Sequence, residues 1–311
     1  MEFSTDLPKY RFSACLFSIW LCANWPQAAY AACTLIPTAG NDNFVCDSAT
    51  SGPLTDLSGN NTLTFPANGT GRINGNVTFG TGADTVTIAS GTVAGALSQG
   101  NGIDDFVMSG GTVQSLAQGD GRDTFLMTGG TIVGAFEDGD VARMTGGSIG
   151  RVDMKLDNNL FEMSGGQILR NLVTGLGTDT IIVSRGRIGG NISVSNGNDS
   201  ITVTGGEIVG EIRAGNGDDT LVWDGDGIIR SQILLEAGND SATLRNSIIG
   251  PNVSIAPGSR VENSIVRDSI IHDDAVVENV LLEASVVGNR ATVHGRCVRL
   301  NVGDSTELDF N

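Results

Sequence analysis

Short apolar runs recur along the middle of the chain with a period of about 20 residues. Each period has a glycine, an aliphatic residue two positions later and another apolar residue three or four positions after that. A third short run, such as 86–88, 125–127, 181–183 or 221–223, precedes each glycine. The glycines are Gly71, Gly91, Gly111, Gly130, Gly147, Gly166, Gly186, Gly206 and Gly227. Because helical periodicity is absent, this repeat predicts an all-β chain in which three short strands and their turns form one coil of a parallel β-helix.

The two apolar positions after each glycine predict the packing of the coils. Neighbouring coils of a β-helix stack about 4.8 Å apart, so equivalent side chains form ladders inside it. The first expected ladder is Val93, Val113, Ile132, Ile149, Ile168, Ile188, Ile208 and Ile229. The second is Leu97, Leu116, Phe136, Val152, Leu172, Ile192, Ile212 and Ile233. We expect the glycines at turns that need a positive φ or a close backbone approach.

The period shortens after Arg245. Aliphatic residues there follow one another in steps of five or six, so three steps make a coil of about 16 residues. These residues are Ile249, Ile255, Val261, Val266, Ile271, Val277, Leu282, Val287 and Val293. This rhythm predicts a tail of hexapeptide-type β-helix.

Residues 1–31 have the pattern of a secretory signal peptide. Lys9 and Arg11 precede an apolar run of about 12 residues, and Ala29-Tyr30-Ala31 is an A-x-A cleavage site. The run is too short for an ordinary membrane-spanning helix, and no later segment approaches that length. We expect an exported mature chain that starts at Ala32 and has no transmembrane segment.

Export would leave three cysteines in the mature chain and place them in an oxidising compartment. Cys33 and Cys46 enclose a short stretch rich in Gly, Asn and Asp, and in an oxidising compartment a disulfide between them would tie down the mature N-terminus. Cys297 is then left without a partner. No Cys/His cluster has the spacing of a zinc site.

One aspartate per coil is the last residue of a Gly-x-Gly-x-Asp motif or of a near match to it. These residues are Asp84, Asp104, Asp123, Asp179, Asp199, Asp219 and Asp240. Calcium-binding repeats need tandem nine-residue copies, whereas this motif occurs once per coil, so we expect Asx turns in which each side chain caps its own backbone. Stacked carboxylates repel, however, and a hard cation prefers carboxylate oxygens. Weak calcium binding by this row is therefore kept as a hypothesis, and no other cofactor is expected.

Composition argues against several functions. The formal charge is −17, and Lys155 is the only lysine after the leader, so a nucleic-acid partner is not expected. His272 and His294 are the only histidines, and neither has a recognisable catalytic partner. Glu137/Asp138 and Asp153/Asp157 are the candidate acid–base pairs for carbohydrate chemistry, but the long loops that would build a cleft are missing. We therefore expect no enzyme.

Residues 1–245 resemble bacterial autotransporter passengers. The resemblance rests on the mature start, 32–46, and on blocks such as 125–132 and 215–221. It implies a right-handed β-helix on a Gram-negative cell surface, in the outer membrane or outside the cell, often adhesive, with an unidentified surface ligand. A spanning barrel needs at least eight strands of about 10 residues, for which 246–311 leaves no room. Without a barrel supplied from elsewhere, we expect the chain in the periplasm.

The tail is similar to the left-handed β-helix that closes sugar-1-phosphate nucleotidyltransferases. The similarity lies in its rhythm and in its ending, 300–310. Such enzymes need a separate nucleotide-binding domain, and 67–244 lacks the strand–helix alternation for one. The alternative to a non-catalytic adhesin is therefore a nucleotidyltransferase remnant whose tail self-associates as an oligomerisation or regulatory module.

These patterns predict four parts: a signal peptide (1–31), an N-terminal cap (32–66), passenger-like coils (67–245) and a hexapeptide-like tail (246–311). Two helices of opposite hand do not continue smoothly into one another. Three arrangements stay open at the junction near 244–248. The helices meet end on, one half adopts the hand of the other, or the halves fold independently.

Overall fold

The computed structural model describes residues 33–245, 248–249, 253–256, 258–263, 265–295 and 301–302. The expected signal peptide, residues 1–31, lies outside these residues. Within them every regular element is a β-strand, and no helix long and apolar enough to span a membrane is present. The all-β prediction is therefore confirmed.

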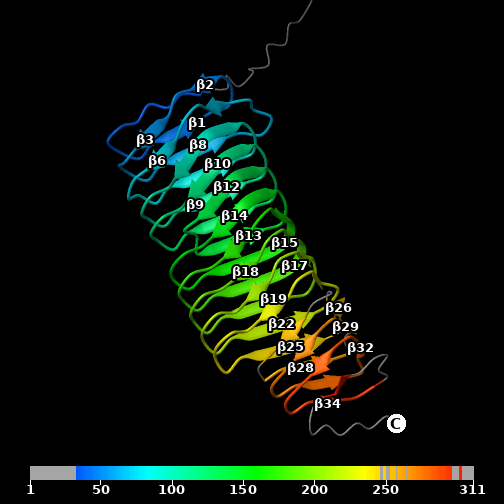
Figure 1. The fold of residues 1–311 in the computed structure, drawn as a ribbon. Coiled ribbons are helices and arrows are strands. Elements are labelled where there is room, and N and C mark those ends of the chain that lie inside the picture. The colour runs from blue at the N-terminus through cyan, green and yellow to red at the C-terminus, as the bar shows by residue number, and fades with distance from the viewer. Residues whose placement is uncertain are drawn as a thin grey trace, which may run out of the picture. The chain divides into compact units, whose positions relative to one another are not determined.

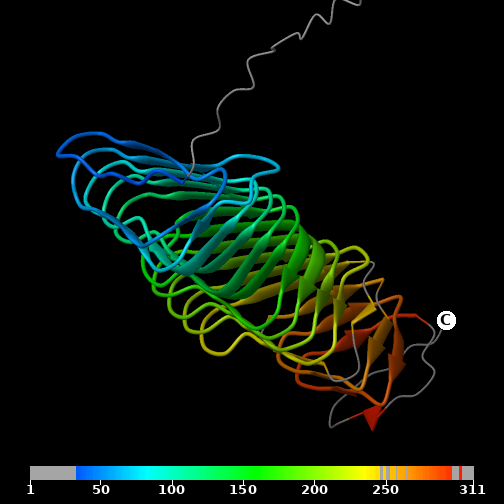
Figure 2. The same ribbon diagram turned by 90° about the horizontal axis from the view of Figure 1, so that it is seen from above.

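The strands form a parallel β-helix with three faces, which we call A, B and C, and the chain runs A, B, C in every coil (Figure 1). Figure 2 shows the coils of the described residues lying one over another. Face A contains β1 (Asn43–Val45), β4 (Thr62–Phe65), β7 (Thr85–Ile88), β9 (Asp105–Met108), β11 (Thr124–Met127), β13 (Val141–Met144), β19 (Ser200–Val203), β22 (Thr220–Asp224), β25 (Ser241–Arg245), β28 (Arg260–Glu262), β31 (Val276–Glu278) and β34 (Thr292–Val293).

Two strands run through the corner from face A to face B without a break: β15 (Leu160–Ile168) and β17 (Thr180–Ile188). Face B otherwise contains β2 (Thr50–Ser51), β5 (Arg72–Ile73), β20 (Glu207–Ile208), β23 (Ile228–Ile229), β26 (Ile248–Ile249), β29 (Ile265–Arg267) and β32 (Leu281–Glu283).

Four strands run through the corner from face B to face C: β8 (Thr92–Ser98), β10 (Thr112–Ala117), β12 (Thr131–Glu137) and β14 (Ser148–Asp153). Face C otherwise contains β3 (Leu54–Asp56), β6 (Val77–Phe79), β16 (Leu172–Val173), β18 (Ile192–Ser193), β21 (Ile212–Arg213), β24 (Ile233–Leu234), β27 (Ser254–Ile255), β30 (Ile270–Ile271), β33 (Val286–Val287) and β35 (Asn301–Val302).

The ladders predicted from the sequence fill the interior. On face B, Val93 pairs with Val113 and Val113 with Ile132, and this row continues through every predicted member to Ile229. On face C the row from Leu97 to Ile233 is also reproduced. All of these side chains are buried. Alternate residues of short strands thus point inward, where they remove apolar surface from water.

Aromatic side chains fill part of the core between face A and face C. Phe106, Phe125 and Phe136 stack in sequence, with ring centroids 5.5 Å and 4.1 Å apart. Trp223 on β22 is fully buried. It is the only tryptophan after the leader, so its fluorescence reports on this part of the core.

The tail continues the same stack. On face A, β25 pairs with β22 on one side and with β28 on the other. The repeat shortens here as predicted, because the step along the chain from Val261 to its partner Val277 is shorter than the step from Leu221 to its partner Ala242. The other two faces also continue, because β26 lies against β23 and β27 against β24.

This continuity decides the relative hand of the tail. The strands stay parallel, each new coil stacks on the previous one, and the order A, B, C is kept from β22 through β28. A change of hand would reverse the order of the faces. The expected change from a right-handed to a left-handed helix is therefore wrong, and the tail adopts the hand of the coils before it.

The tail turns its corners with single residues in the left-handed region. Positive φ values recur there every five or six residues, which explains the hexapeptide rhythm. These residues are Asn263, Asp268, Asp273, Asn279, Ala284 and Asn289.

The described chain begins with a cross-linked segment. Cys33 and Cys46 form a disulfide, and Thr34 makes an antiparallel bridge with Val45. Strand β1 pairs with β4, so the stack already starts at Asn43. Cys297 lies outside the described residues.

Candidate functional site

The aspartates of the Gly-x-Gly-x-Asp motifs form a row inside the helix, at the corner where face C leads into face A. All seven predicted members are buried: Asp84, Asp104, Asp123, Asp179, Asp199, Asp219 and Asp240. Each accepts a hydrogen bond on Oδ1 from the main-chain N–H of the row member one coil earlier, at 2.6–2.9 Å. The expected Asx turns are therefore wrong, because these bonds join neighbouring coils rather than closing a turn on their own backbone.

Three members of this row were not identified from the sequence. Asn61 and Asn159 replace aspartate, and Asp140 accepts the N–H of Asp123 on Oδ2 at 2.7 Å. The two asparagines also donate their side-chain amides to carbonyls three residues earlier, those of Ser58 and Leu156. The sequence does mark these three residues, because Asn61, Asp140 and Asn159 each directly precede a face A strand, as the seven predicted aspartates do.

The other carboxylate oxygen of each predicted aspartate is buried and has no hydrogen-bond partner among the described residues. Burial, together with the smaller effect of neighbouring carboxylates in the row, raises the pKa of Asp104 and Asp199 to about 6 and that of Asp123 to about 7. Burial also raises the pKa of Asp84, Asp219 and Asp240. The main-chain N–H opposes this in every case but does not cancel it, because removing a carboxylate from water penalises its charged form.

The described residues contain no group of three acidic, histidine or cysteine side chains placed to hold a metal ion. The row offers one carboxylate per coil, with one oxygen already accepting an N–H. Calcium binds six to eight oxygens, so a single such group is a poor donor set. Weak calcium binding by the row stays a hypothesis, and the melting temperature in the presence of calcium decides it.

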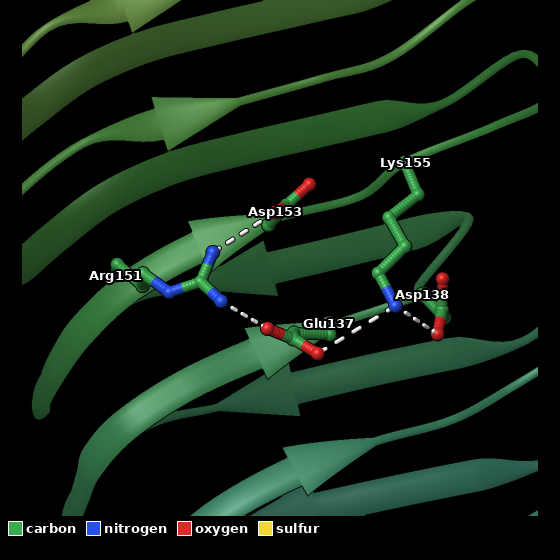
Figure 3. A network of polar contacts seen from close by, with 5 residues as sticks. All are labelled: Glu137, Asp138, Arg151, Asp153 and Lys155. Carbon is green, nitrogen blue, oxygen red and sulfur yellow. Dashed lines mark hydrogen bonds and ion pairs between the residues drawn. The ribbon is translucent and has the colours of Figure 1, made fainter.

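One coil is shorter than its neighbours and carries a charged cluster. The turn after β12 is cut short, so the step from Thr124 to its partner Val141 is shorter than the next step on this face, from Val141 to Leu160. Figure 3 shows Arg151 between Glu137 and Asp153, with Lys155 reaching Glu137 and Asp138. The Lys155 ammonium lies 2.8 Å from Asp138 and 3.5 Å from Glu137. The hydrogen bond from Lys155 to Asp138 raises the pKa of the lysine.

This cluster contains the carboxylates that were candidates for carbohydrate chemistry. Glu137, Asp138 and Asp153 each face a cation, and Asp157 lines a hollow of only ≈ 80 Å³ beside them. A glycosidase needs one protonated and one ionised carboxyl group on either side of a bound sugar. Glu137, Asp138 and Asp153 are each paired with arginine or lysine, so the cluster is suited to holding the short coil in place.

The two histidines lie in the tail and are exposed. His272 packs beside Gly288, and the main chain of His294 bonds to Val277 and Asn279. A nearby hollow of ≈ 550 Å³ is lined by Asp273, Asp274, Asn289 and Arg290, and Arg290 pairs with Asp274 at 2.7 Å. Neither histidine side chain forms a hydrogen bond or ion pair within the part of the chain that the structure describes.

A hollow of the coiled body lies at the corner between faces A and B. It has a volume of ≈ 670 Å³ and is lined by Ser164, Ser184, Arg185, Thr204, Gly205, Gly206 and Asp226. A second hollow of ≈ 240 Å³ shares Ser164 and Ser184 with it and extends to Arg143, Thr145 and Glu162. We call the two together the A–B groove.

A row of hydroxyl groups lines the A–B groove, one from each coil: Thr145, Ser164, Ser184 and Thr204. Sequence reasoning did not identify this row. Its signal is a Ser or Thr directly after the last buried apolar residue of the face A segment in these four coils, as in Met163-Ser-Gly-Gly166.

The sequence matches no protein-family model and no curated protein. Among solved structures, the chain is similar to a hyperactive, Ca2+-dependent, β-helical antifreeze protein from an Antarctic bacterium. The two are 22% identical, the match covers 88% of this chain and 80% of that one, and the TM-score is 0.47.

Proposed function

We propose that this chain is an exported, non-catalytic β-helical protein that acts at a cell surface as an adhesin-type passenger. The observation that carries the proposal is the combination of an unbroken stack with an open groove along its side. Strands, turns and core all serve to present the same lateral surface coil after coil. A surface of this kind suits binding to an extended partner.

The absence of catalysis is part of the proposal, and the charges of the described residues support it. The carboxylates of the charged cluster are paired with cations, and the aspartates of the internal row are shielded from any substrate. General acid–base chemistry needs groups that reach the substrate with a suitable protonation state. The carboxylates of the cluster are already paired with cations, and those of the internal row cannot reach a substrate.

Adhesion is the direct test. Beads coated with residues 32–311 should bind to bacterial and host cell surfaces, and soluble protein should compete with them. Beads coated with the same chain after heat unfolding carry the same charge and composition, so they are the matched control. Equal binding by folded and unfolded chains, or no binding by either, would overturn the proposal.

Export is tested separately. Residues 1–31 fused to a reporter enzyme that is active only outside the cytoplasm should give activity, and the same fusion with an acidic residue in the apolar run should not. Reporter activity that is independent of this run would contradict export by this leader.

A second candidate function, self-association through the tail, is favoured by one observation. Ile270 and Val286 pair across neighbouring coils of face C, and both side chains are about two-fifths exposed, at 44% and 40%. Adjacent exposed aliphatic side chains favour association. Light scattering should then show an oligomer of residues 32–311, which Ile270→Ser together with Val286→Ser converts to monomer. A monomeric parent chain would remove this candidate.

A further inference from the structure

Arg185 occupies a corner position at which the neighbouring coils have glycine. The equivalent residues along the stack are Gly110, Gly129, Gly146, Gly165, Gly205 and Gly225. At each of them an added Cβ would lie 2.2–2.5 Å from the carbonyl oxygen of the residue below. Real Cβ atoms do not approach an oxygen so closely, so the packing at these six positions requires glycine.

The chain accommodates Arg185 by a local change of register. Met163 pairs with Val183, but the next residue, Ser164, pairs with Arg185, so that Ser184 is skipped. The regular spacing returns at Gln167, which pairs with Arg187. This is a β-bulge at the corner between faces A and B, and bulges re-aim side chains and are frequent beside binding sites. The departure from the repeat therefore places an arginine in the A–B groove.

The guanidinium of Arg185 is available for a ligand. The residue is exposed, and within the described part of the chain it forms no ion pair or hydrogen bond through its side chain. Most other arginines of the coiled body pair with a carboxylate, as Arg187 does with Glu207 at 3.0 Å. Asp226 lines the same hollow but forms no ion pair with Arg185, so the guanidinium can take a negatively charged group of a ligand.

The surroundings of Arg185 add hydroxyl groups in a regular order. Ser164, Ser184 and Thr204 line the same hollow, each from a different coil. Coils are spaced by about 4.8 Å. A sugar residue in an extended 1,4-linked polysaccharide has nearly this length, so successive sugars would meet successive hydroxyl groups.

We propose that the A–B groove binds a carboxylated polysaccharide, a chain of uronic acid residues, that lies along the stack. Arg185 takes one sugar carboxylate in a bidentate pair, and the row of Thr145, Ser164, Ser184 and Thr204 bonds to sugar hydroxyl groups. Arg143 is paired with Glu162 at the far end of the groove, where the polysaccharide would leave it. This inference rests on the proposed function, because it names the ligand class of the lateral surface.

The test uses the oxidised chain 32–311 with polygalacturonate as the probe and dextran as a neutral comparator. Arg185→Gly removes the guanidinium and allows the regular register of the other coils at this corner, whereas Arg185→Lys keeps a long side chain at the bulge. Arg170 is the matched control, because it is also exposed and without a side-chain partner among the described residues but lies at another corner. Unchanged Trp223 fluorescence and melting temperature will show that each variant is folded.

We expect polygalacturonate to bind the parent chain and Arg170→Ala with similar affinity, and Arg185→Gly about tenfold or more weakly, as expected for the loss of one charge-assisted bidentate contact. Arg185→Lys should recover only part of the loss, since lysine keeps the charge without the fork. Dextran should bind more weakly than polygalacturonate. Equal binding of the two polymers, or equal losses in Arg185→Gly and Arg170→Ala, would overturn the proposal.

The adhesion assay separates this inference from the function on which it rests. If coated beads adhere and Arg185→Gly beads adhere equally well, the chain is an adhesin and the groove is not its binding site. If folded beads do not adhere at all, the proposed function fails.

Discussion

The main-chain N–H of Asp104 donates a hydrogen bond of 2.8 Å to Oδ1 of Asp123, one coil further on. Both carboxyl groups are fully buried, and the second oxygen of each has no partner among the described residues. One carboxyl oxygen thus ties two coils together, while the other is held away from water. A protonated carboxyl group meets both conditions, because it still accepts the N–H and carries no charge.

The first prediction concerns pH. Because burial raises the pKa of Asp104 and Asp199 to about 6 and of Asp123 to about 7, the folded chain binds protons more tightly than the unfolded one. Their stabilising contribution is complete below the unfolded pKa of about 4 and is lost as pH rises through 6 to 7. The melting temperature of the oxidised chain should therefore fall between pH 5 and pH 8.

The second prediction uses Asp123→Asn. Asn61 already occupies this row and accepts the main-chain N–H of Asp42 on its amide oxygen at 3.1 Å, so an amide fits the row and can keep the cross-coil hydrogen bond. The variant should be more stable than the parent at pH 8, by about 1–3 kcal/mol, and little changed at pH 5. Denaturant unfolding at the two pH values measures this, with the exposed Asp120→Asn as control. A variant destabilised equally at both pH values would show that the row prefers a carboxylate.

The third prediction concerns calcium. Since the row supplies one carboxylate per coil and its aspartates are buried, we expect millimolar calcium at low ionic strength to leave the melting temperature unchanged at pH 7. Magnesium at the same concentration controls for ionic strength. A rise with calcium alone, removed by a chelator and absent in Asp123→Asn, would establish the calcium hypothesis instead.

The fourth prediction concerns the glycines that precede the aspartates. At Gly217, with φ of 140°, an added Cβ would lie 1.6 Å from the carbonyl oxygen of Gly197, so Gly217→Ala must separate two coils. We expect a loss of about 2 kcal/mol or more in the free energy of unfolding. Gly52→Ala is the control, because nothing lies within 4 Å of its added Cβ. Equal effects at the two sites would contradict the close stacking of these turns.

The fifth prediction concerns the tail. A chain that ends at Arg245 leaves β25 unpaired on the side where β28 lies. Each coil is stabilised by its neighbours, so this truncation should lower the melting temperature, which Trp223 fluorescence measures. The expected fall is about 2–4 °C for every kcal/mol of stabilising free energy that the contact between β25 and β28 supplies. An unchanged melting temperature would mean that the tail is an independent unit.

The fold could be predicted closely because its repeat leaves little freedom. Once Val93, Val113 and Ile132 are recognised as equivalent, stacking them in one ladder fixes the register of face B, and the structure has this register. The shortened period after Arg245 was also readable. The hand of the tail was not, because steps of five and six residues describe a coil without saying which way it turns. The pairing of β25 with β28 across the junction fixes the hand of the tail relative to the coils before it.

The candidate site was less predictable. Sequence identified the aspartate row but not its hydrogen bonds, since an Asx turn and a bond to the next coil use the same residues. The A–B groove was missed for another reason. Arg185 stands out only against the glycines of six other coils, and the meaning of that difference depends on the carbonyl oxygen that a Cβ would meet there.

The central claim is that the lateral surface binds an extended partner without chemically changing it. In the most direct measurement, residues 32–311 are incubated with polygalacturonate for many hours. Co-sedimentation of the protein with the polymer and the length of the polymer are followed in the same sample. We predict that the protein sediments with the polymer and that its chain length and number of reducing ends stay constant. A steady shortening of the polymer, at a rate proportional to the protein added, would contradict the account and identify an enzyme.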